Sequence, residues 1–200
     1  MPVCLAEPQA GDFCCIPVPG GFGTAIEAGE YLAERLQGQP AYLRAYDHAE
    51  VYVGQPDADG PYGYTYSAYS NNGIGTTTGK RPLPCLPAAL PGSIWSSGII
   101  PLAQSQRDAI VAWCEAHPCV PYSWPDYGAI ALHALRIPAP GLKAYIAGTS
   151  SMICSQYTDS AYADTSVHLF SDGRWPGFVT PGDLAGLLLA RARPLVPRAA

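Results

Sequence analysis

The sequence predicts an α+β fold, because segments with strand patterning come first and segments with helical patterning follow. Apolar and polar residues alternate over much of 42–70, whereas after residue 103 the apolar residues recur at helical spacing. The chain has 200 residues, of which 48% are hydrophobic and 14% charged, enough for one packed core. We therefore expect a single domain over residues 1–200, with its core over about 11–190 and an Arg- and Pro-rich tail at 191–200.

Four segments of the first half predict strands: 11–18 is a short strand, and 42–54, 62–70 and 71–79, the last of which includes a turn, form an antiparallel meander. In the first, Pro17 indicates an edge strand or a bulge, because proline cannot donate to a sheet ladder. In the second, His48 and Glu50 share one face, and Ala49 and Val51 share the other.

Five segments predict helices: 24–38, 104–117, 127–135, 152–163 and 179–192. Thr24 is a candidate N-cap of the first, and Pro181 lies in the first turn of the last. Residues 82–103 contain five prolines and no usable period, so we expect a long connection over the core there rather than a helix or strand.

The charge and the apolar pattern exclude several classes of partner. With 11 basic and 16 acidic residues the net charge is −5, which disfavours nucleic acid and anionic lipid. No apolar run is long enough to span a membrane, and the N-terminus has no signal-peptide pattern. We expect a protein that is cytoplasmic as synthesised and that reaches an outside target in a virion or by release to the cell wall.

Seven cysteines are present, an odd number that leaves at least one thiol unpaired. We expect most to be reduced, buried packing residues, with one kept for chemistry. Cys154 has the best setting, since Ser151 is a candidate N-cap that would place it in the first turn of a helix. There the helix dipole favours a thiolate, and free N–H groups can hold an oxyanion. The alternative is that Cys154 is simply buried.

Four histidines could serve as the base. His48 lies on a predicted strand, where a rigid backbone can hold an imidazole at an open surface. His117 and His133 are expected to be core or helix-end residues, and His168 is a weaker rival base. Residues 114–119 hold two cysteines and a histidine, but their spacing is irregular and no second pair completes a zinc site, so no metal or cofactor is expected.

Five motifs occur in an informative order: GDF at 11–13, DHAEVYVG at 47–54, PYSWPDY at 121–127, MICSQYTDSAY at 152–162 and VTPGDLAGLL at 179–188. Their order resembles the circularly permuted NlpC-type branch of the papain-like cysteine hydrolases, in which the histidine strand precedes the nucleophile helix. The resemblance implies an antiparallel sheet or small barrel packed against helices. It also implies that Cys154 is the nucleophile and His48 the general base.

The sequence departs from the family at the third, orienting position. The family usually places an acid, often within a Glu-Ala pair, on the strand after the histidine strand, whereas this chain has Ser67-Ala68. A serine can accept a hydrogen bond from imidazole but cannot offset the charge of imidazolium. Glu50, on the same strand face as His48, and the adjacent Asp47 are the alternatives.

These observations predict a thiol-dependent hydrolase of amide bonds that acts through an acyl-enzyme on Cys154. The resemblance implies a cell-wall peptide as substrate, in a bacterial or bacteriophage context. Four aromatic residues are candidates for the substrate cleft or for the core: Tyr52, Tyr66, Tyr122 and Trp124. Two alternatives stay open: an acyltransferase or lipid-ester thiol hydrolase of the same fold, and a weakly active or inactive module that binds its ligand in a virion or cell wall.

Overall fold

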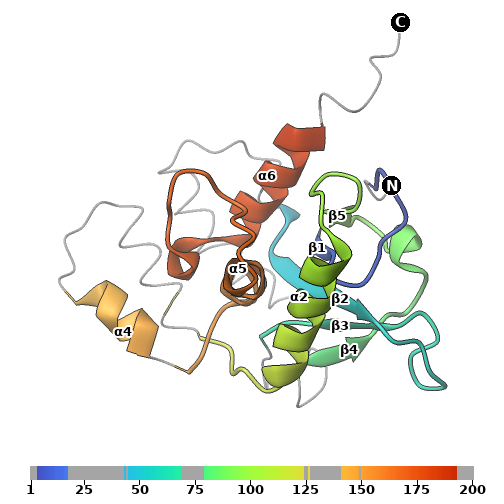
Figure 1. The fold of residues 1–200 in the computed structure, drawn as a ribbon, viewed down its shortest axis with the longest axis horizontal. Helices are drawn as coiled ribbons and strands as arrows, with labels where there is room; N and C mark the ends of the chain where they lie inside the picture. Colours follow the sequence, from blue (N-terminus) through green and yellow to red (C-terminus); the bar gives the residue numbers. More distant parts are fainter. Residues whose placement is uncertain are drawn as a thin grey trace, which may run out of the picture.

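The computed structural model describes residues 4–17, 43, 45–68, 79–123, 126, 141–148 and 150–192. Over these residues it shows an α+β fold with one five-stranded antiparallel sheet, in the strand order β4-β3-β2-β1-β5 (Figure 1). The strands are β1 (Phe13–Ile16), β2 (His48–Gly54), β3 (Tyr64–Tyr66), β4 (Lys80–Pro82) and β5 (Ile94–Trp95). The helices are α2 (Gln104–Ala116), α4 (Leu142–Gly148), α5 (Cys154–Asp164) and α6 (Pro181–Ala192), with 3₁₀ turns η2 (Pro87–Ala89) and η3 (Pro176–Phe178).

The predicted antiparallel meander is present as β2, β3 and β4, but the bounds of all three strands differ. β3 covers only Tyr64–Tyr66 of the predicted 62–70, of which 69–70 lie outside the described residues. β2 begins at His48 rather than at 42, because the N–H of Tyr46 turns back to the carbonyl of Leu43 at 3.0 Å. The last strand is Lys80–Pro82, later than the predicted 71–79, of which 71–78 lie outside the described residues.

The prediction that residues 82–103 contain no helix or strand was wrong. β5 pairs with β1 through Cys14 and Trp95 and through Cys15 and Ile94, and η2 precedes it. Ile94 and Trp95 are fully buried, so the segment is held by packing. Two residues are too few to show an alternating pattern in the sequence.

β1 is an interior strand, with β2 on one side and β5 on the other, not the predicted edge strand. Pro17 follows the last strand residue, so it removes no donor from the ladder. Gly11 leads into the strand at φ +88°, where an added Cβ would lie 2.9 Å from the Cα of Arg107. The Nη1 of Arg107 in turn donates to Asp12 at 2.9 Å, fixing the start of the strand against α2.

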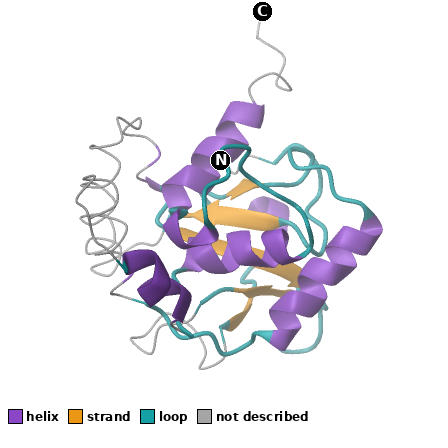
Figure 2. Ribbon diagram, turned by 60° about the vertical axis from the view of Figure 1, so that its left-hand side comes forward, coloured by secondary structure: helices purple, strands orange, loops and turns teal. Residues whose placement is uncertain are grey.

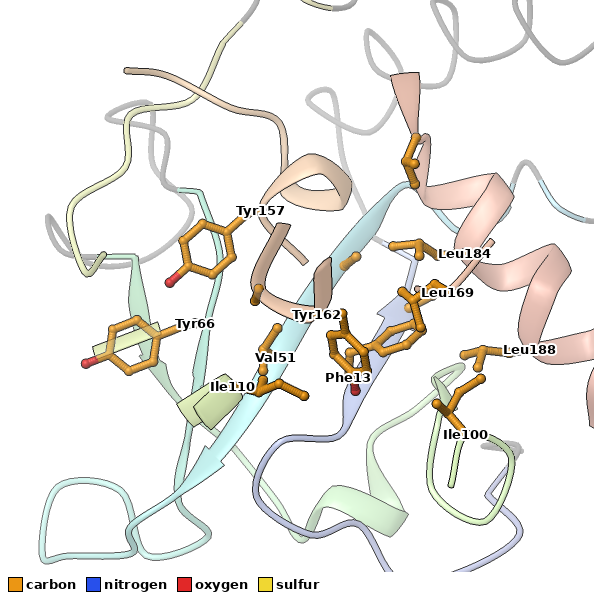
Figure 3. Packing of buried hydrophobic residues seen from close by; sticks show 14 of the residues in the cluster. Phe13, Val51, Tyr66, Ile100, Ile110, Tyr157, Tyr162, Leu169, Leu184 and Leu188 are labelled. Carbon is orange, nitrogen blue, oxygen red and sulfur yellow. The ribbon is translucent and has the colours of Figure 1, made fainter. Parts of the chain in front are cut away.

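Helices α2, α5 and α6 pack on one face of the sheet, and the main core lies between them and the strands (Figures 1 and 2). Figure 3 shows Phe13, Val51 and Tyr66 of the sheet meeting aliphatic and aromatic side chains of the helices. The ring of Tyr162 stands edge-on to that of Phe13, with centroids 5.4 Å apart. The opposite face of the sheet carries a smaller cluster of Cys14, Ile16, Leu83, Leu90 and Trp95.

Three of the five predicted helices are confirmed, as α2, α5 and α6, with ends shifted by up to two residues. Helix α4 was not predicted. The predicted helices at 24–38 and 127–135 lie outside the described residues. None of the helices that the structure describes has both the length and the apolar content needed to cross a membrane.

Candidate active site

Cys154 is the first residue of α5, so it lies in the first turn of a helix as predicted, but the predicted cap is wrong. The N-cap is Ile153, and Ser151 lies outside the helix. Met152 is held in extended backbone beside Tyr122, with its N–H donating to the carbonyl of Pro121 at 2.9 Å. The helix therefore begins after this short bridge, two residues later than predicted.

The two residues after the cysteine anchor the start of α5. The side chain of Gln156 accepts a hydrogen bond from the N–H of Ile153 at 2.8 Å and donates to the carbonyl of Gly177 at 2.9 Å. The hydroxyl of Ser155 donates to the carbonyl of Val179 at 2.7 Å. Both side chains are buried, so Cys154 stands on a fixed helix start. The motif at 152–162 includes both residues, but the sequence did not predict these contacts.

His48 is the first residue of β2, the strand on which α5 packs, and the structure brings it to Cys154. The sulfur of Cys154 is both a hydrogen-bond partner and an electrostatic partner of the imidazole. The Nε2 atom of His48 lies 3.1 Å from Oε1 of Glu50. Because Nε2 faces the carboxylate, Nδ1 is the nitrogen available to the sulfur.

The surroundings of His48 favour its charged form. Burial by itself would lower the pKa of the imidazole, but the electrostatic interaction and hydrogen bond with Cys154, and the hydrogen bond and charge of Glu50, outweigh it. Together they raise the pKa of His48 from 6.5 to about 10. The imidazole therefore lies between a sulfur and a carboxylate that both favour its protonated form.

Glu50 receives donors from two neighbouring strands. Oε2 accepts a hydrogen bond from the hydroxyl of Thr65 on β3 at 2.8 Å and from Nη2 of Arg81 on β4 at 2.5 Å. Burial, with 3% of the residue exposed, would raise its pKa, but the hydrogen bond to His48 and the charge of Arg81 lower it to about 2. Glu50 is therefore a fixed anion. Sequence reasoning missed Thr65 and Arg81, since neither is near Glu50 in the chain.

Of the two orienting candidates, Glu50 contacts His48 and Ser67 does not. The hydroxyl of Ser67 donates to the backbone carbonyl of Ala49 at 2.9 Å, a bond that ties β3 to β2. Asp47, the third residue considered, is buried just before β2.

The four candidate cleft aromatics do not form one group. Tyr66 is 7% exposed and belongs to the main core, beside Tyr157 in Figure 3. Tyr52 stands edge-on to Trp95 and lines a cavity with Tyr62, on a different part of the surface from Ser151 and Gln156. Tyr122 pairs with Met152, two residues before the nucleophile. Trp124 lies outside the described residues.

Access to the cysteine is restricted in this conformation. Cys154 has no exposed surface, and the side chain of His48 is 16% exposed. A cavity of about 330 Å³ lies between α5 and η3, and its lining includes three residues close to Cys154 in the sequence, Ser151, Met152 and Gln156. Residues on both sides of Cys154 in the sequence therefore line this cavity.

The rival histidines have other surroundings. His117 is the C-cap of α2, where Nδ1 lies 2.8 Å from the carbonyl of Trp113 and the ring stacks on the indole, as predicted for a helix-end residue. His168 lines a separate cavity beside Asp159. His133 lies outside the described residues.

Comparison with known proteins finds no matching family model, no matching curated protein and no matching solved structure. The functional interpretation therefore depends on the geometry of Cys154, His48 and Glu50.

Proposed function

We propose that this protein is a thiol-dependent hydrolase of amide bonds, with Cys154 as nucleophile, His48 as general base and acid, and Glu50 as the orienting residue. The observation that carries the proposal is the carboxylate of Glu50 on the second nitrogen of His48. An imidazole held between a cysteine sulfur and a buried anion is the arrangement that nucleophilic thiol catalysis needs.

The contacts support a reaction in two halves. His48 takes the proton of the Cys154 thiol, the sulfur attacks the carbonyl carbon, and the negative charge moves to the carbonyl oxygen. The N–H groups of the first turn of α5, Cys154 and Ser155 among them, have no carbonyl four residues earlier within the helix and are donors for that oxyanion. His48 then gives its proton to the leaving amine as the C–N bond breaks. In the second half His48 takes a proton from water, which cleaves the thioester and frees the sulfur.

Glu50 performs two tasks in this scheme. Its contact with Nε2 keeps the ring turned so that Nδ1 faces the sulfur, and its charge stabilises the imidazolium. The contact favours an active enzyme over the alternative of an inactive binding module, since such a module needs no anion behind its histidine.

The order of the two elements supports a permuted papain-like arrangement as the finer fold proposal. The histidine strand β2 precedes the nucleophile helix α5 in the chain, and the two pack together. The resemblance implies a cell-wall peptide as substrate. The enzyme would reach it in a virion or by release to the cell wall. Acyl transfer and lipid-ester cleavage would use the same cysteine and histidine, so the test includes them.

The test is hydrolysis of peptidoglycan fragments and of short acyl esters by the full chain and by Cys154→Ala. We expect release of new amino groups from the fragments by the parent and a loss of at least about 10³-fold in Cys154→Ala. Cys119→Ala is the matched control, because this cysteine is exposed and outside the site, and it should keep full activity.

Labelling with iodoacetamide followed by peptide mapping supplies a second readout. We expect peptidoglycan fragments to reduce the labelling of Cys154 by iodoacetamide and to leave the labelling of Cys119 unchanged. Survival of hydrolysis in Cys154→Ala, or cleavage of esters but not amides, would contradict the proposal as stated.

A further inference from the structure

Asp159 is a buried carboxylate that the proposed mechanism does not use. It lies on α5, one and a half turns after Cys154, and only 5% of the residue is exposed. It lines a cavity of about 570 Å³ formed by α5 and residues 168–176. A buried carboxylate costs free energy unless donors or a counter-charge surround it.

Within the part of the chain that the structure describes, no hydrogen bond reaches Asp159. The cation that lowers its pKa most is Arg174, but this guanidinium is already engaged. Nε and Nη2 donate to the carboxylate of Asp172, at 2.9 and 2.6 Å to Oδ2, and Nη1 lies 3.0 Å from Oδ1 of Asp183. Three carboxylates therefore surround one guanidinium, and Asp159 is the one without a contact.

The rest of the cavity is largely apolar. Leu169, Phe170, Trp175 and Pro176 contribute to its walls. The guanidinium of Arg174 lies over the ring of Phe170, 4.3 Å from the centroid. The cavity thus combines an uncompensated anion with walls that suit a hydrocarbon stem, which is the complement of an amphipathic cation.

We propose that this cavity is a binding site for a primary ammonium group on an apolar stem, with the ammonium donating to the carboxylate of Asp159 and the stem lying against Trp175 and Phe170. A lysine side chain, a diamino acid and an alkylamine share this chemistry. The ligand supplies the donors and the positive charge that the protein leaves out at this position.

The titration of Asp159 agrees with this geometry. Burial is the largest cause that raises the pKa of the carboxyl, and the carboxylates of Asp183 and Asp172 also raise it, while Arg174 and His168 lower it; the net result is a rise from 3.8 to about 6. At pH 7.5 the carboxyl is therefore ionised and ready for a cation. The cavity also shares Ala163, Trp175 and Pro176 with the smaller cavity beside Met152 and Gln156, although binding does not depend on the proposed hydrolase activity.

The test is titration of the full-length ¹⁵N-labelled protein with n-butylammonium chloride at pH 7.5, with n-butanol as the neutral probe of equal size. We expect saturable shifts of the amides of Ala163, Phe170 and Gly173 with the amine and none with the alcohol. Asp159→Asn should lower the affinity for n-butylammonium by at least about tenfold, the loss expected when a charged hydrogen-bond partner is removed. Asp108→Asn, an equal charge change at an exposed site on α2, should leave the affinity unchanged.

Three outcomes would overturn the proposal: equal binding of the alcohol, shifts confined to amides outside the cavity, or unchanged amine affinity in Asp159→Asn. The comparison of amine with alcohol uses the parent protein alone, so it decides the proposal even where the variant folds poorly. The spectrum of the variant without ligand shows whether it has kept the fold.

Discussion

Glu50 and Asp159 are two carboxylates with nearly the same burial and opposite behaviour. They are 3% and 5% exposed, yet the pKa of Glu50 falls to about 2 and that of Asp159 rises to about 6. Glu50 has His48, Thr65 and Arg81 as hydrogen-bond or ion-pair partners. Asp159 has only the electrostatic attraction of His168 and of the Arg174 guanidinium, which two other carboxylates hold. Partners, rather than burial, therefore decide whether a buried carboxylate in this protein stabilises the fold or costs it stability.

The sheet explains the difference. Glu50 lies on the interior strand β2, where pairing places Tyr52 opposite Thr65 and Thr65 opposite Arg81, so both donors stand in adjacent strands. Asp159 lies on a helix that faces a segment of irregular structure, where the one cation is used locally by Asp172. Backbone pairing supplies donors to the first carboxylate, and no such ladder serves the second.

Glu50→Gln should give the largest effect. The change removes the charge that faces both His48 and Arg81 and leaves a guanidinium with a buried Nε without its counter-ion. We expect the free energy of unfolding at pH 7 to fall by about 3 kcal/mol, as for one partner lost from a buried ion pair. Urea unfolding measures this, and hydrolysis, if the proposed function holds, should fall with it.

The sign of the pH dependence follows from the pKa of Glu50. Because its folded pKa of about 2 lies below the ordinary 4.5, its contribution is present above pH 4.5 and is lost as the pH falls toward 2. The difference in the free energy of unfolding between the parent and Glu50→Gln should therefore become smaller as the pH falls from 4.5 to 2. The double variant Glu50→Gln, Arg81→Gln should recover part of the loss, and full additivity would show that the two side chains are not coupled.

Asp159→Asn should have the opposite sign. The folded pKa of about 6 lies above the ordinary 3.8, so the ionised carboxylate costs stability above pH 6, and that cost disappears as the pH falls below 3.8. We expect the variant to unfold with about 2 kcal/mol more free energy than the parent at pH 7.5. Urea titrations should show this difference in the free energy of unfolding disappearing as the pH falls from 6 to 4. A variant less stable than the parent at pH 7.5 would mean that the carboxylate has a structural partner.

The sequence predicted the parts of this comparison that depend on local patterning. Alternation placed His48 and Glu50 on one face of a strand, and the helix start placed Cys154 in a first turn, which are the positions the structure shows. The first prediction depends on the two-residue period of a strand, which neighbouring residues reveal. The second depended on Ser151 as the N-cap, and the structure has Ile153 in that role.

The partners of the two carboxylates could not be predicted, because they depend on strand register and on loop packing. Thr65 and Arg81 reach Glu50 only through the pairing of β2, β3 and β4, and the β4 boundary was itself predicted too early. The strand β5 was missed for the same reason, since two residues carry no period. Asp159 has no hydrogen bond among the described residues because Arg174 donates to Asp172 instead. No residue spacing in the sequence predicts that choice of partner.

Thr65→Val should give the smallest effect and tests the comparison at a single bond. Valine keeps the shape and the strand preference of threonine but removes the donor to Oε2 of Glu50. We expect a loss of about 1 kcal/mol in urea unfolding and a small rise in the pKa of Glu50, as one of its three partners is gone. Thr65→Ser, which keeps the hydroxyl, should lose less stability than Thr65→Val at pH 7 and should keep the pKa of Glu50 low. Equal losses in the two variants would show that the methyl group matters there and the hydrogen bond does not, and Glu50 would then depend on His48 and Arg81 alone.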